Sequence, residues 1–218
     1  MSDLPAATTS VAPVKPRGFS GMVGLAIALA VLGLLSGAAA LGVLAMKDQM
    51  NGFLGAMWAG VPAESRDLLL DQQARLREAG LPVPGAVIGG LALPIAIWLL
   101  VSASRASQRR AGTARALAQG AVALAVVEVG GLVVQLLAQA RTRPIMAEIA
   151  RSIAGSDLRM PAEVRGMMST IMQASMVVGV VFAIGWSLGK IACCLWVRHV
   201  ARKPEIRAWL GEGSPPLG

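Results

Sequence analysis

Four long apolar blocks constrain the fold of this chain more than any other feature of its sequence. They cover residues 20–46, 83–102, 116–140 and 171–197. A helix that crosses a bilayer needs about 20 mostly apolar residues, and each block is long enough. Only 15% of the residues are charged, whereas a soluble domain carries about 25%. The sequence therefore predicts an all-α integral membrane protein, a bundle of four transmembrane helices.

The blocks are arranged as two tandem units. The segment Val61–Arg66 (VPAESR) recurs at Met160–Arg165 (MPAEVR), 99 positions later, and the same offset aligns the first apolar block with the third. We predict one unit over 19–102 and a second over 116–200, each made of a span, an outer amphipathic connector and a span. Two spans per unit is an even number, so both units enter from the same side and are related by an approximate axis along the membrane normal.

The first outer connector covers residues 47–82. An apolar stripe at i, i+3, i+4, i+7 and i+8 predicts a short helix on the membrane surface. The stripe consists of Met50, Phe53, Leu54, Met57 and Trp58. Pro62 suits the first turn of a second helix, and Gly80 suits its C-terminal end.

The second outer connector covers residues 141–170. Here Pro144 predicts the start of a short helix that Gly155 ends, and Pro161 predicts the start of another. That last helix is expected to continue into the fourth span, because no proline follows before Val197.

The orientation across the membrane follows from the linker at residues 103–115. Arg105, Arg109, Arg110 and Arg115 occur there with no acidic residue between residues 102 and 116. Positive charge favours the cytoplasmic side, so we expect this linker and both termini in the cytoplasm. Arg141 and Arg143, beside the third span on the opposite side, argue for the reverse orientation. Arginine outnumbers lysine sixteen to four, which is typical of GC-rich bacterial genomes, so the expected location is the bacterial inner membrane.

The two ends of the chain are predicted to be tails. Residues 1–18 are poor in large apolar groups, which predicts a disordered cytoplasmic tail. A cleaved signal peptide is the alternative, but the apolar run is long for one and its duplicate lies in mid-chain. In the cytoplasmic tail at 201–218, Ile206, Trp209 and Leu210 are expected to rest on the inner leaflet, beside basic residues that attract anionic lipid.

Glycines recur at helical spacing inside the blocks. Small residues four apart lie on one face of a helix and let a second helix approach closely, which in lipid supplies the attraction between helices. The candidate helix-packing residues are Gly33, Gly37, Gly85, Gly89, Gly179, Gly185 and Gly189.

Glu128 and Lys190 are the charged residues well inside apolar blocks, and Gln135 is a polar neighbour. A charge at mid-bilayer costs about 2.5–3.5 kcal/mol on insertion scales. Three interpretations remain open: Glu128 and Lys190 pair as a structural lock between spans, they are stabilised separately with Lys190 extending towards the cytoplasm, or Glu128 responds to protons or cations in a pathway.

The repeated segments also carry charges on the outer side. Glu64 and Arg66, like Glu163 and Arg165, stand at the start of a predicted helix. Residues two apart do not face each other on a helix, so these charges are interpreted as helix-start chemistry or as an outer docking face for a partner.

The sequence excludes several classes of function. It contains no phosphate loop, no Gly-x-Ser-x-Gly and no His-Glu-x-x-His, and Cys193, Cys194 and His199 lack the spacing of a zinc site. We therefore expect no catalytic residues, metal or cofactor. The +8 net charge flanks spans, so no nucleic acid is expected. The predicted function is a non-enzymatic structural, accessory or partner-binding module, with the lipid bilayer, a homo-oligomer or a membrane partner around it. A small permease or channel subunit that uses Glu128 is the alternative.

Overall fold

The computed structural model describes residues 14–46, 49, 52, 63–155 and 162–212. Within these residues, four helices are long and apolar enough to cross a membrane. They are α1 (Phe19–Ala45), α4 (Pro82–Ser107), α5 (Thr113–Gly155) and α6 (Ala162–Ala201). The shorter α3 (Ala63–Ala79) lies between α1 and α4 in the chain, and α7 (Pro204–Trp209) follows α6. The predicted all-α bundle of a multi-pass membrane protein is confirmed, while the duplication of its two halves stays a prediction.

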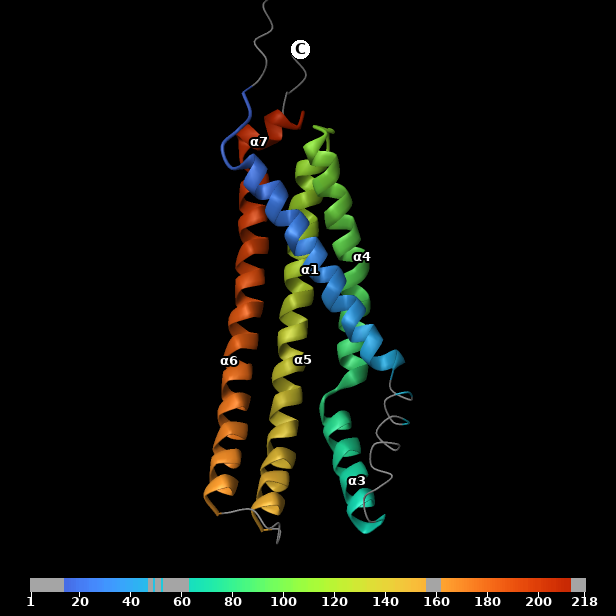
Figure 1. Cartoon of the computed structure of the whole chain (residues 1–218). Helices are drawn as coiled ribbons and strands as arrows, with labels where there is room; N and C mark the ends of the chain where they lie inside the picture. The colour runs from blue at the N-terminus through green and yellow to red at the C-terminus, as the bar shows by residue number, and fades with distance from the viewer. Residues whose placement is uncertain (1–13, 47–48, 50–51, 53–62, 156–161, 213–218) are drawn as a thin grey trace, which may run out of the picture.

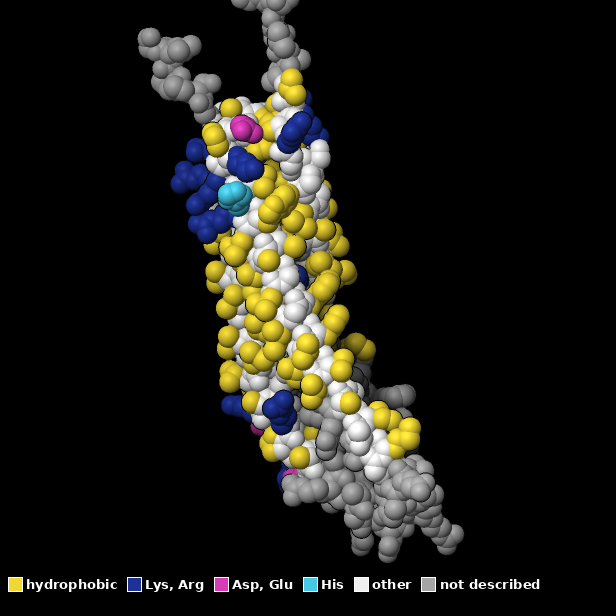
Figure 2. Space-filling view, turned by 90° about the vertical axis from the view of Figure 1, so that its left-hand side faces the viewer, with side chains coloured by type: hydrophobic (Ala, Val, Ile, Leu, Met, Phe, Trp, Pro, Cys, Tyr) yellow, Lys and Arg dark blue, Asp and Glu magenta, His cyan; other side chains and the backbone are white. Residues whose placement is uncertain are grey.

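The spans form two helix pairs, which meet mainly between α4 and α5 and to a lesser extent between α1 and α6. α1 packs most extensively against α4, α5 packs against α6, and α4 contacts α5 between the pairs. α5 and α6 run side by side, whereas α1 leans across the bundle (Figure 1). Large apolar side chains cover the outside, among them Val178 at 66% and Phe182 at 70% exposure. The broad hydrophobic surface between two charged ends (Figure 2) is what a lipid-embedded bundle requires.

The α1–α4 interface is a close contact between backbones. A Cβ added at Gly89 would lie 2.6 Å from the Cβ of Ala40, and one added at Gly37 would lie 2.7 Å from the carbonyl oxygen of Gly89. Neither position has room for a larger side chain. Glycine is therefore what allows these two spans to approach each other.

The best-packed part of the core lies at the end of the bundle where α1 begins. Met22, Leu99 and Leu117 are fully buried there, and Ile206 of α7 and Leu210 directly after it join the same cluster. α7 folds back over the helix ends (Figure 1). The prediction that Ile206, Trp209 and Leu210 rest on the leaflet is therefore wrong: Ile206 and Leu210 are buried in the protein core and Trp209 packs against it, half-buried. The core offers them a better packed apolar environment than the interface does.

Aromatic and cationic groups fix α7 in this position. The rings of Phe19 and Trp209 meet edge to face with centroids 6.4 Å apart. The guanidinium of Arg109, in the turn between α4 and α5, lies 3.8 Å from the centre of the Trp209 ring. A carboxylate oxygen of Glu212 accepts a hydrogen bond from the backbone N–H of Ala114 at 2.7 Å, which caps the N-terminus of α5.

The outer ends of the helices differ in part from the prediction. α3 ends before Gly80, as expected, whereas Pro62 and the stripe from Met50 to Trp58 lie outside the described residues. The prediction that Pro144 starts a separate helix is wrong, because α5 continues through it. One proline removes a single hydrogen bond, and membrane-protein helices tolerate this where other groups satisfy the backbone. α6 is continuous into the fourth span, as predicted.

Candidate functional site

Glu128 of α5 and Lys190 of α6 meet inside the membrane-spanning part of the bundle. The Lys190 Nζ lies 2.5 Å from the Glu128 Oε2, and the two side chains are 14% and 12% exposed. Both residues lie in the predicted spans, where an isolated charge is costly. Of the three interpretations left open by the sequence, the structure contains the pair between the third and fourth spans.

A pocket of about 630 Å³ opens beside this ion pair. Residues of both helix pairs line it, from α1 and α4 and from α5 and α6. All four spans line it, and most of the lining is apolar or small. Its polar lining residues are Ser36, Glu128, Gln135, Ser187 and Lys190. The arrangement therefore combines a charged wall with an apolar hollow inside the bilayer.

Helical periodicity places several of these groups on common faces. Gln135 lies seven residues, or two turns, after Glu128 on α5, so both side chains reach the same pocket. Ser187 lies three residues before Lys190 on α6 and is 7% exposed. Sequence reasoning missed Ser36 and Ser187; the three-residue spacing from Lys190 is the signal that would have identified Ser187.

The seven candidate packing glycines fall into two groups. Gly33, Gly37 and Gly89 lie against other helices, with Gly33 facing Ala96 and Leu124. The other four have nothing within 4 Å of an added Cβ, apart from their own helix backbone. Gly85 and Gly179 line the 630 Å³ pocket. Gly185 and Gly189 line a second hollow of about 250 Å³, which lies between α1 and α6.

The proposed outer docking residues lie at helix starts. Glu64 and Arg66 belong to the first turn of α3, and Glu163 and Arg165 to the first turn of α6. Their side chains lie outside the part of the chain that the structure describes. The helix-start and docking interpretations therefore both stay predictions.

The site consists of an ion pair, four lining helices and a small set of uncharged polar groups. The described lining residues of this pocket include one carboxylate and one amine. No protein-family model, no curated protein and no solved structure gives a significant match to the chain. The basis for a function is therefore the geometry of this multi-pass membrane protein.

Proposed function

We propose that this chain is a non-enzymatic membrane module that binds another transmembrane helix, in the first place from a second copy of itself, along the face of α6. The observation that carries the proposal is the poor coverage of α6. Only 11% of its most apolar 18-residue window is buried, against 39% for α4. Gly179, Gly185 and Gly189 on this helix have open space beside them.

The α1–α4 contact supports this proposal by analogy within the chain. Lipid gives no hydrophobic push between helices, so association depends on close packing at small residues. Gly37 and Gly89 already use that device inside the chain. On α6, Gly185 and Gly189 are four residues apart, as Gly33 and Gly37 are on α1. The glycines of α6 border hollows of about 630 and 250 Å³, which side chains of a docked helix would fill.

The ion pair supports a scaffolding role for this part of the bundle. Glu128 has its counter-charge in Lys190 at 2.5 Å, so each charged side chain is held by a partner on the neighbouring helix. The pair links α5 to α6 and holds the docking helix in place. It leaves the exposed surface of α6 apolar, which suits an uncharged partner helix.

The proposed location is the bacterial inner membrane, with both ends of the chain in the cytoplasm. The support is the clustering of basic residues at the end where α1 starts and α7 lies (Figure 2). Arg105, Arg109, Arg110 and Arg115 are exposed at that end. Positive charge at one face of a membrane protein favours the cytoplasmic side.

The test is energy transfer between donor- and acceptor-labelled copies of the full chain in liposomes. We expect transfer that falls on lipid dilution and is abolished in the double variant Gly185→Leu, Gly189→Leu. The matched control is Gly24→Leu, Gly42→Leu on α1, where the same added bulk meets open space. Equal transfer in both variants, or none in the unmodified chain, would contradict self-association through α6.

A small permease or channel subunit is the second candidate function. The observation that favours it is the pocket beside Glu128, which is polar on one wall and lined by all four spans. Solute or proton flux in reconstituted liposomes that disappears in Glu128→Gln would favour this candidate over the helix-binding module. Flux that is absent in the unmodified chain would remove it.

A further inference from the structure

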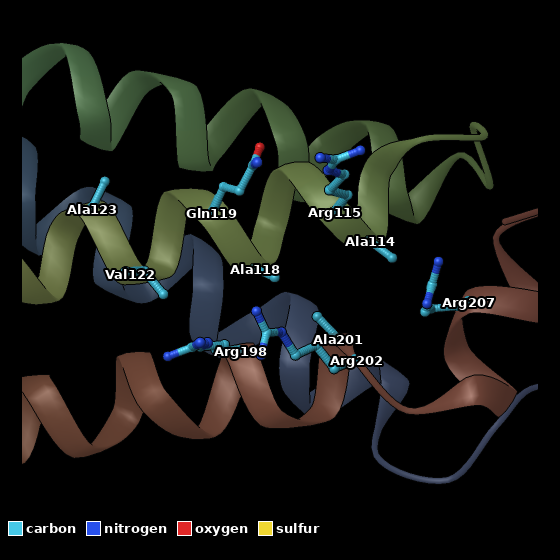
Figure 3. A pocket seen from close by; sticks show the side chains of 10 residues that line it. All are labelled: Ala114, Arg115, Ala118, Gln119, Val122, Ala123, Arg198, Ala201, Arg202 and Arg207. Atoms are coloured by element: carbon cyan, nitrogen blue, oxygen red, sulfur yellow. The ribbon is translucent and has the colours of Figure 1, made fainter.

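Another pocket, of about 770 Å³ and separate from the two already described, lies where α5, α6 and α7 meet. Four arginines from three separate elements line it: Arg115 of α5, Arg198 of α6, Arg202 directly after α6, and Arg207 of α7. Gln119 adds an amide. In Figure 3 the side chains of Arg198 and Arg202 extend from the end of α6 into the space facing α5, and Arg207 stands at the far end of that space.

The charge of this pocket is left uncompensated by the described residues. No acidic residue lines it, and none of its four arginines forms an ion pair with a described residue. The carboxylate of Glu212 lies near its edge but accepts the hydrogen bond from Ala114 at the start of α5. In Figure 3 the side chains of Arg115 and Gln119 extend from α5 on the side away from α6, so the guanidinium groups that face the space between α5 and α6 are those of Arg198 and Arg202, with Arg207 at its end. Such groups favour an anion, and arginine binds phosphate through two parallel hydrogen bonds.

The position of the pocket says which phosphate it fits. Arg115 lies in the first turn of the α5 span and Arg198 in the last turn of α6, which is the level of lipid headgroups. From there the lining continues down α5 through Ala118, Val122 and Ala123. Seven residues of helix separate Arg115 from Val122, a rise of roughly 10 Å towards the bilayer interior.

We propose that this pocket binds an anionic phospholipid. Its phosphate lies among Arg198, Arg202 and Arg207, with Arg115 at the rim of the pocket, and the first part of an acyl chain lies along Ala118 and Val122. The two-part lining argues against free phosphate as the ligand, because a soluble anion would leave the apolar section to water. The site is independent of the proposed contact along α6, since the two share no lining residue.

The experiment is native mass spectrometry of the full chain in detergent, titrated with phosphatidylglycerol and, as a zwitterionic reference, with phosphatidylcholine. We expect retention of phosphatidylglycerol in preference to phosphatidylcholine. The double variant Arg198→Gln, Arg202→Gln should weaken this retention at least about tenfold, because charge-assisted hydrogen bonds are lost. The matched control Arg105→Gln, Arg110→Gln removes the same charge at the same end but outside the pocket, and should retain the lipid.

Two further measurements distinguish a defined phospholipid site from a diffuse attraction to positive charge and from a site for free phosphate. Arg198→Lys, Arg202→Lys preserves charge but not the paired hydrogen bonds, so it should weaken lipid retention while the far-ultraviolet circular dichroism stays unchanged. Unchanged retention in this variant, or equal loss in the pocket and control variants, would show a diffuse attraction and overturn the site. Displacement of the lipid by an equal concentration of inorganic phosphate would overturn a phospholipid as the ligand.

Discussion

Replacing Gly89 by alanine tests whether close backbone contact holds α1 against α4. The new Cβ would lie 2.6 Å from the Cβ of Ala40 and 3.2 Å from the carbonyl oxygen of Gly37. Carbon atoms in contact are about 3.5–4.0 Å apart, so the two helices must separate by about 1 Å. Ala40 is too short to move aside by rotation, and the displacement therefore falls on the backbones.

The neighbouring Gly90 provides the matched control, because an added Cβ there meets nothing within 4 Å. Both substitutions gain the same helix propensity, about 1 kcal/mol relative to glycine, and this gain cancels when the variants are compared. What remains is the overpacking at position 89, which typically costs about 1–3 kcal/mol. We therefore expect Gly89→Ala to be less stable than Gly90→Ala by that amount.

The assay is reversible unfolding in mixed micelles with increasing dodecyl sulfate, followed by circular dichroism. The free energies of unfolding of Gly89→Ala and Gly90→Ala are compared under the same conditions. The pair Gly37→Ala and Gly42→Ala repeats the comparison from the α1 side, since Gly37 faces α4 closely and an added Cβ at Gly42 meets nothing within 4 Å. Equal stabilities within each pair would refute the reasoning that these spans touch through their glycines.

Two further predictions concern charged groups. Glu128→Leu and Lys190→Leu should each destabilise the bundle by about 3–5 kcal/mol, because each leaves its partner's charge unpaired inside the bundle. The double variant should cost much less. Additive losses of the two single variants in the same unfolding assay would argue against the pair as a unit. Glu212→Ala should lower the free energy of unfolding by about 0.5–2 kcal/mol and speed amide hydrogen exchange at Ala114, because the start of α5 loses its cap. Unchanged exchange at Ala114 would contradict this capping role.

The number and position of the spans could be predicted from the sequence because the bilayer itself imposes them. Every backbone polar group in lipid needs an internal partner, so an apolar block of sufficient length becomes a helix. The block at residues 20–46 corresponds to α1 at Phe19–Ala45, and α3 ends directly before Gly80, as predicted. The prediction was wrong at Pro144, where a local rule about proline was outweighed by the continuity of α5.

Only the tertiary structure decided which side chains meet. The sequence left three interpretations of Glu128 open, and the contact with Lys190 depends on how α5 and α6 are rotated against each other. It identified seven candidate packing glycines, of which Gly33, Gly37 and Gly89 are close to another helix.

The same limit applies to the end of the bundle near α7. Arg115, Arg198, Arg202 and Arg207 are scattered along the sequence and gather only because α5, α6 and α7 converge. Helical periodicity gives the face on which a residue lies, and this can be obtained from the sequence alone. It does not give the angle at which two helices cross or the neighbour that each face contacts, since these depend on packing between segments far apart in the chain.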